Sequence, residues 1–116
     1  MSPATAQFVY RAARGRQWID QTRGIIEPQA FFRRENDLGG LSVALTPQAA
    51  AAWLTKLHGM IRIDVQKLSE RGFTLVEGEG GHLNICEVPF NTPENCDAAF
   101  SCASEIIACC DIVPYP

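Results

Sequence analysis

The chain has 116 residues, of which 47% are hydrophobic and 20% charged, with a formal net charge of −3. This length and composition are typical of one globular domain and exclude a disordered chain. Because apolar stretches stay well short of the roughly 20 residues that span a bilayer, and because the start lacks a secretory signal pattern, we expect a cytoplasmic protein with no membrane partner.

Residues 7–11 are rich in β-favouring side chains and predict a first strand. Pro28 limits the next apolar segment to a sheet edge or a bend, and residues 30–34 predict a short strand. Turn chemistry at 36–40 (Asn-Asp-Leu-Gly-Gly) then leads into 41–45, where apolar residues alternate as in a strand with one buried face.

A helix is predicted over 47–57. Thr46 supplies an N-cap hydroxyl, Pro47 suits the first helical position, and Gly59 ends the segment. Its expected buried stripe consists of Ala50, Trp53, Leu54 and Leu57.

The second half of the chain predicts short strands and a long final helix. Strands are expected at 60–65, 73–76 and 82–88, a helical turn at 66–71, and a helix over 93–109 that begins after Thr92. The helix stripe, at spacings of three and four, consists of Cys96, Ala99, Phe100, Ala103, Ile107 and Cys110.

These elements predict an α+β fold within a single domain, 1–116. We expect a mostly antiparallel sheet of five to six short strands, covered by the helices at 47–57 and 93–109. The short connections between residues 60 and 88 favour hairpins over the long crossovers of a parallel sheet.

The five cysteines are an odd number, and no secretory signal accompanies them, which argues against a disulfide framework. They show no paired Cys-x-x-Cys spacing, so no metal site is predicted. We interpret most of them as small buried apolar residues in a reducing compartment.

Charge is unevenly distributed along the chain. Residues 1–34 contain six arginines and two carboxylates, a net charge of +4, whereas residues 35–116 carry −7. The first third therefore offers either a local anion site or a solvated arginine surface. The acidic remainder is unlike the basic surface of nucleic-acid-binding proteins, so nucleic acid is not the expected partner.

The motifs of several enzyme classes are missing. The sequence has no phosphate loop ending in Gly-Lys-Ser/Thr, no Gly-x-Ser-x-Gly and no His-Glu-x-x-His. The glycine-rich run at 77–81 is acidic and would repel phosphate.

Ligand-binding residues are predicted near the ends of strands. Arg11 beside Tyr10 can hold a phosphate through its fork of N–H donors, and Gly40 allows close approach of the backbone to a ligand. Arg33 and Arg34 add cationic groups to the same third of the chain. We predict that Tyr10, Gly40, Arg33 and Arg34 bind a ligand.

The candidate catalytic set is Arg11, Ser42, His82 and Glu87. A carboxylate near a reacting sugar can stabilise an oxocarbenium-like centre or act as a base. The alternative for each residue is ordinary: Arg11 and Glu87 as surface charges, Ser42 as an outward strand residue and His82 as a turn residue.

Val9-Tyr10-Arg11, followed by Gly40-Leu41-Ser42-Val43, resembles small bacterial domains with the ADP-ribosyltransferase-like fold, including toxin-type members that attack NAD. Those domains use an Arg on the first strand, a polar residue on the next core strand and a late Glu. The resemblance implies that Arg11, Ser42 and Glu87 are the matching positions, with NAD as substrate and no cofactor. Cys86 and Val88 flank Glu87 in place of the usual Glu-x-Glu or Gln-x-Glu pair.

A second resemblance is to small bacterial proteins of unassigned function with Tyr-Arg at the start, Leu-Ser-Val in the middle and a late His. This likeness implies no activity.

Two other functions fit the sequence. A non-catalytic module would bind a protein partner, or a second copy, through its arginines or a strand edge; a toxin–antitoxin or defence complex is one such setting. A metal-independent ribonuclease would use His82 with Arg33 or Arg34, against the overall acidity of the chain. The discriminating observation is whether Arg11 and Glu87 open into one pocket.

Overall fold

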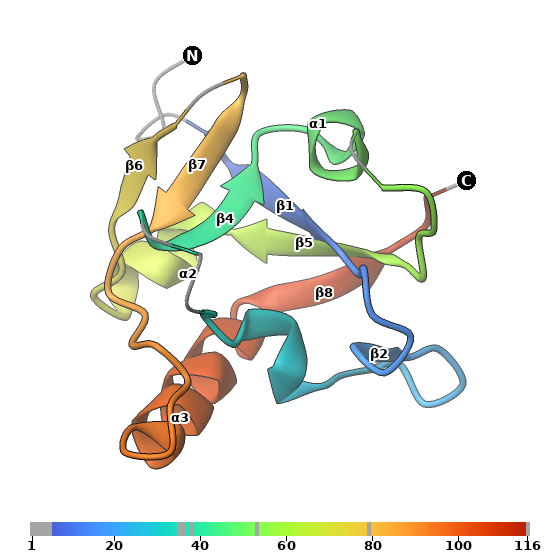
Figure 1. Cartoon of the computed structure of the whole chain (residues 1–116). Helices are drawn as coiled ribbons and strands as arrows, with labels where there is room; N and C mark the ends of the chain where they lie inside the picture. The colour runs from blue at the N-terminus through green and yellow to red at the C-terminus, as the bar shows by residue number, and fades with distance from the viewer. Residues whose placement is uncertain (1–5, 35–36, 38, 53, 79, 116) are drawn as a thin grey trace.

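The computed structural model describes residues 6–34, 37, 39–52, 54–78 and 80–115. Its main element is a six-stranded antiparallel sheet in the order β6-β7-β4-β1-β5-β8 (Figure 1). The strands are β1 (Phe8–Ala12), β4 (Leu41–Ala44), β5 (Met60–Asp64), β6 (Leu75–Glu77), β7 (His82–Ile85) and β8 (Cys110–Val113). A separate small hairpin pairs β2 (Ile19–Asp20) with β3 (Ile25–Ile26). The predicted α+β class and antiparallel sheet are confirmed.

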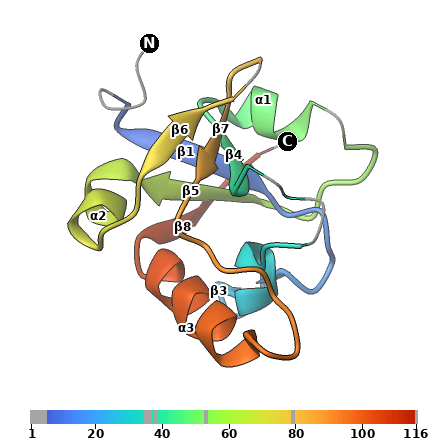
Figure 2. The same ribbon diagram turned by 60° about the vertical axis from the view of Figure 1, so that its left-hand side comes forward.

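The helices lie on both faces of the sheet. They are the 3₁₀ helix η2 (Pro28–Phe31) and the α-helices α1 (Pro47–Ala51), α2 (Val65–Glu70) and α3 (Cys96–Ile107). Helices α3 and η2 pack together on one face, while α1 lies over β1 and β4 on the other (Figures 1 and 2). Of the helices within the described residues, none has the length and apolar character needed to cross a membrane.

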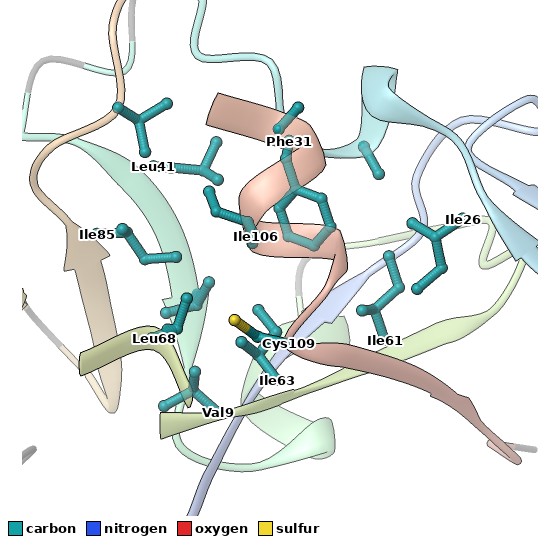
Figure 3. Close-up of a cluster of buried hydrophobic side chains, with 14 of the residues drawn as sticks. Val9, Ile26, Phe31, Leu41, Ile61, Ile63, Leu68, Ile85, Ile106 and Cys109 are labelled. Carbon is teal, nitrogen blue, oxygen red and sulfur yellow. The ribbon is translucent and has the colours of Figure 1, made fainter. Parts of the chain in front are cut away.

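The core lies between the sheet and α3 with η2 (Figure 3). Strand alternation sends every second side chain into this layer. Val9 of β1 lies opposite Ile63 of β5, and both side chains are in the core. Each fully buried aliphatic or aromatic side chain contributes about 1.5–3 kcal/mol. The largest fully buried side chains are Phe31, Leu41, Met60, Ile61, Ile63, Leu68, Leu83, Ile85 and Ile106.

The helix predicted over 47–57 is much shorter than expected. Its start is confirmed, because the Thr46 hydroxyl accepts from the amide of Ala49 at 3.1 Å, but α1 ends at Ala51. The segment after α1 instead packs beside the end of β1, where the amide of His58 donates to the carbonyl of Ala13 at 2.9 Å. That contact requires a non-helical backbone. No residue of α1 is buried, and Trp53 of the predicted stripe lies outside the described residues.

The strand predicted at 30–34 is wrong. Residues 28–31 form η2, in which the amide of Ala30 donates to the carbonyl of Glu27 at 3.0 Å. Ala30 and Phe31 are consecutive and both fully buried, which one-sided strand burial does not allow.

The final helix is confirmed, with different limits and a different buried face. It begins at Cys96, because Thr92 instead caps a turn by accepting from the amide of Asn95 at 3.2 Å. The buried residues are Ala99, Ala103 and Ile106, whereas Phe100 is 54% exposed and Cys96 is exposed. The predicted stripe shares Ala99 and Ala103 with the buried face but misses Ile106, so its direction along the helix was partly wrong.

Candidate anion-binding site

The site lies where β1 and β4 separate. β1 pairs with β5 at every position from Phe8 to Ala12, but its register with β4 consists of Tyr10 opposite Ala44 alone. The Arg11 guanidinium fills the resulting gap, with Nη1 donating to the carbonyl of Ser42 at 2.6 Å. Its Nε donates to the carbonyl of Ala30 at 2.5 Å, so Arg11 ties β1 to both β4 and η2.

Arg11 is a buried cation to which no carboxylate of the described residues is bonded. The residue is 7% exposed, and its guanidinium carbon lies 5.1 Å from the centre of the Trp18 ring. Burial, reinforced by repulsion from Arg14, lowers the pKa of Arg11 to about 9; Asp37 opposes the shift and Arg34 adds to it. The group is therefore still charged at neutral pH.

Two adjoining cavities open onto this cluster. One, of about 190 Å³, is lined by Arg11, Arg14, Asp37, Ser42 and His82, with Ala12, Val43, Ala50 and Leu54. The other, of about 420 Å³, is lined by Arg14, Gly15, Trp18, Arg34 and Asp37. Arg14 and Asp37 belong to both, so the two cavities form one arginine-lined hollow.

Several donors in this hollow are available to a ligand. Nε and Nη1 of Arg11 donate to backbone carbonyls, and because no fully buried side-chain nitrogen among the described residues lacks a partner, Nη2 is not fully buried. The side chains of Arg14 and Arg34 form no ion pair with a described residue. Asp37 is the one carboxylate lining either cavity among those residues. With three guanidinium groups against one carboxylate, the hollow attracts anions.

The structure brings together three of the four predicted catalytic residues. Arg11, Ser42 and His82 line the same cavity, as the sequence-based hypothesis requires. Ser42 binds Arg11 through its backbone carbonyl, while its side chain is exposed.

Glu87 is not part of this cavity. It follows β7, and its carboxylate accepts from the amide of Thr74 at 2.7 Å. Burial raises the pKa of Glu87, but the hydrogen bonds from Thr74 outweigh it and hold the pKa below its ordinary value. The carboxylate fixes the start of β6, and the expected meeting of Arg11 and Glu87 in one pocket does not occur.

Of the predicted ligand-binding residues, Arg34 alone lines the hollow. Tyr10 projects from the face of β1 opposite to Arg11. Gly40 is buried with a φ of +128°, and a Cβ there would lie 2.5 Å from the carbonyl oxygen of Ile85, so its role is to bring β4 against β7.

Arg33 has a structural role. Its guanidinium lies 3.8 Å from the centre of the Phe90 ring, and it donates to the carbonyls of Val88 at 3.0 Å and Asp37 at 2.7 Å. These contacts hold the segment after η2 against the segment that precedes α3.

Sequence reasoning missed Arg14, Trp18 and Asp37 as site residues. The run Arg14-Gly15-Arg16 directly after the first strand was the available signal, because a loop at a strand end is a common location for binding residues. Nothing local to the sequence indicates that Asp37 lies beside Arg14.

The cysteines supply no site. Burial raises the pKa of the Cys102, Cys109 and Cys110 thiols, which makes them weak nucleophiles. The prediction that most cysteines are buried is wrong, because Cys109 alone of the five is buried, Cys96 is exposed, and the others, Cys86, Cys102 and Cys110, are half-buried. Within the described part of the chain, no group of three or more His, Cys, Asp or Glu side chains is placed to hold a metal ion.

Comparison with known proteins adds no relative: no family model, no curated protein and no solved structure matches this chain.

Proposed function

We propose that this domain binds a phosphate-bearing nucleotide, of the class that includes NAD, in the hollow lined by Arg11, Arg14 and Arg34. The observation that carries the proposal is the buried Arg11 guanidinium, which is bonded to no carboxylate in the described part of the chain and opens onto a cavity shared with a second arginine.

The chemistry of the hollow suits a diphosphate. Arginine donors pair with phosphate oxygens in a planar fork, and such charge-assisted hydrogen bonds are about twice as strong as neutral ones. Since Arg14 lines both cavities, one phosphate can sit beside Arg11 and the next beside Arg34. Asp37, whose carboxylate accepts from the amide of Arg34 at 2.9 Å, leaves a net positive charge among the described residues that line the hollow.

The proposal is binding, without transfer of ADP-ribose. That reaction needs a carboxylate at the reacting ribose, and the carboxylate that the resemblance implies, Glu87, is engaged with Thr74. Asp37 is the one carboxylate of the described residues that lines the hollow, and it neutralises part of the guanidinium charge.

The test is calorimetric titration of the wild-type protein and of Arg34→Ala with ADP-ribose and NAD. We expect Arg34→Ala to weaken binding by about tenfold or more, since a hydrogen bond to a charged group contributes roughly 1.5–3 kcal/mol. The matched control is Arg23→Ala, which removes an equally exposed arginine that lines neither cavity. Its affinity should stay within about twofold of wild type.

Absence of binding by either ligand, or equal loss in both variants, would overturn the proposal. Glu87→Gln gives a further comparison, because a binding protein should keep its affinity for NAD in that variant. Consumption of NAD by the wild type, lost in Glu87→Gln, would instead establish ADP-ribosyl chemistry.

A further inference from the structure

A third cavity, of about 400 Å³, continues the arginine-lined hollow. It is lined by Gln29, Phe32, Arg34 and Asn91. Arg34 also lines the cavity that contains Trp18 and Arg14, so the two cavities meet at this side chain. The lining changes along the hollow from guanidinium groups to one aromatic ring and two amides.

The backbone explains how Phe32 and Arg34 reach the same cavity. Phe32 is extended, with φ −81° and ψ 123°, and Arg33 forms a parallel bridge with Phe90. Alternation along an extended segment then sends Phe32 and Arg34 to one side and Arg33 to the other. Arg33 is anchored on that other side by the Phe90 ring at 3.8 Å.

Asn91 is fixed by the same contact between the two segments. Its amide donates to the carbonyl of Arg33 at 2.9 Å, which places it beside the residue that follows Phe32. In Figure 1 the segment leading into α3 passes beside the chain that follows η2. The cavity walls are therefore held by backbone bonds.

The lining has the chemistry of a nucleobase site. The face of a Phe ring stacks on a base of any sequence, and an amide side chain presents a donor and an acceptor to the base edge. The side-chain amides of Gln29 and Asn91 have no hydrogen-bond partner among the described residues. Both residues are exposed and Phe32 is half-buried, so the ring and the amides are available together.

We infer that the base of the bound nucleotide stacks on Phe32 between the amides of Gln29 and Asn91, while its diphosphate extends past Arg34 toward Arg14 and Arg11. This inference rests on the proposed function and adds to it the recognition of the nucleotide's base. It makes the ligand a nucleoside diphosphate or a dinucleotide, in preference to a sugar phosphate or inorganic phosphate.

A free nucleotide fits better than a nucleic acid strand. The cationic lining is confined to a few arginines from the first 34 residues, whereas residues 35–116 carry −7 and would repel a longer phosphate backbone.

The experiment compares ADP with pyrophosphate, each titrated into the wild type, Phe32→Leu and Asn91→Ala. We expect ADP to bind the wild type at least about tenfold more tightly than pyrophosphate, because base stacking adds to the phosphate contacts. Phe32→Leu should remove most of that advantage, and it should leave the affinity for pyrophosphate within about twofold of that of the wild type. Stacking should also shift the adenine proton resonances of ADP upfield in the wild type and not in Phe32→Leu.

Asn91→Ala is the variant for the case in which Phe32→Leu does not fold, because the Asn91 side chain is exposed. This substitution should weaken the binding of ADP by about threefold to tenfold. Asn95→Ala is the matched control: Asn95 is exposed on the same segment and does not line this cavity, so its affinity for ADP should not change.

The outcomes separate this inference from the proposed function. If pyrophosphate binds and ADP binds no more tightly, or if Phe32→Leu weakens both equally, the base site is overturned while the phosphate site stands. If neither binds, both fail. Binding of a tetra-adenylate RNA more than about tenfold more tightly than ADP would overturn the inference in favour of a nucleic acid strand.

Discussion

The guanidinium of Arg11 donates a hydrogen bond of 2.6 Å to the backbone carbonyl of Ser42, although the two side chains project from opposite faces of the sheet. In a regular ladder this carbonyl would accept from a backbone amide of β1. Here β1 and β4 have already separated, and a side chain takes the place of the amide. The same guanidinium therefore supports the sheet and faces the cavity.

Replacing Arg11 with Lys should destabilise the protein. One ammonium group cannot serve the carbonyls of both Ala30 and Ser42 as the planar guanidinium does, and a buried carbonyl left without a donor costs about 1–3 kcal/mol. We expect Arg11→Lys to lower the free energy of unfolding by about 2 kcal/mol in urea denaturation. Ser42→Ala is the matched control and should change it by less than about 0.5 kcal/mol, because only the backbone of Ser42 is used. Equal effects would contradict this assignment.

Ligand affinity should depend on pH through Arg11. Burial, and to a smaller extent repulsion from Arg14, lowers the pKa of Arg11 to about 9. A phosphate binds the protonated guanidinium and not the neutral one. The affinity for ADP-ribose, whose diphosphate does not titrate in this range, should stay level from pH 7 to 8. It should then be about tenfold weaker at pH 10, since the unliganded protein loses the proton above its pKa. Calorimetry across this range measures the effect, and a level affinity up to pH 10.5 would refute it.

Gly40→Ala should be among the most destabilising single changes. The backbone has a φ of +128° at this position, and the new methyl group would lie 2.5 Å from the carbonyl oxygen of Ile85 in the neighbouring strand. We expect a loss of about 3 kcal/mol or more, measured by thermal and urea unfolding. Gly72→Ala separates the two causes: its φ is +88° with no atom within 4 Å of the added carbon, so about 1 kcal/mol is expected. Similar losses in both variants would show that strand crowding at Gly40 contributes nothing.

Local patterns predicted much of the fold. The alternation in 41–45 and 60–65 located β4 and β5, and Thr46 marked the start of α1 correctly. The patterns failed where distant contacts decide the outcome. Helix α1 ends early because His58 must reach Ala13, and helical spacing in residues 47–57 carries no trace of that contact.

The candidate site was predictable only in part, for the same reason. The sequence predicts Arg11, Ser42 and His82 as chemically capable residues near strand ends, and the topology places them together. The same criterion predicts Glu87, but this residue follows β7 and its carboxylate binds the amide of Thr74 instead. Asp37 meets Arg11 and Arg14 only after β4 has docked beside β1, so its place in the hollow is a property of tertiary structure.

The single register position between β1 and β4 divides the sheet into two wings, β6-β7-β4 and β1-β5-β8. His82 and Ser42 belong to one wing and Arg11 to the other, so a ligand in their common cavity would contact both halves of the sheet. An anion bound there would hold β1 and β4 together, and it would slow amide hydrogen exchange along both strands, beyond the residues that touch the ligand.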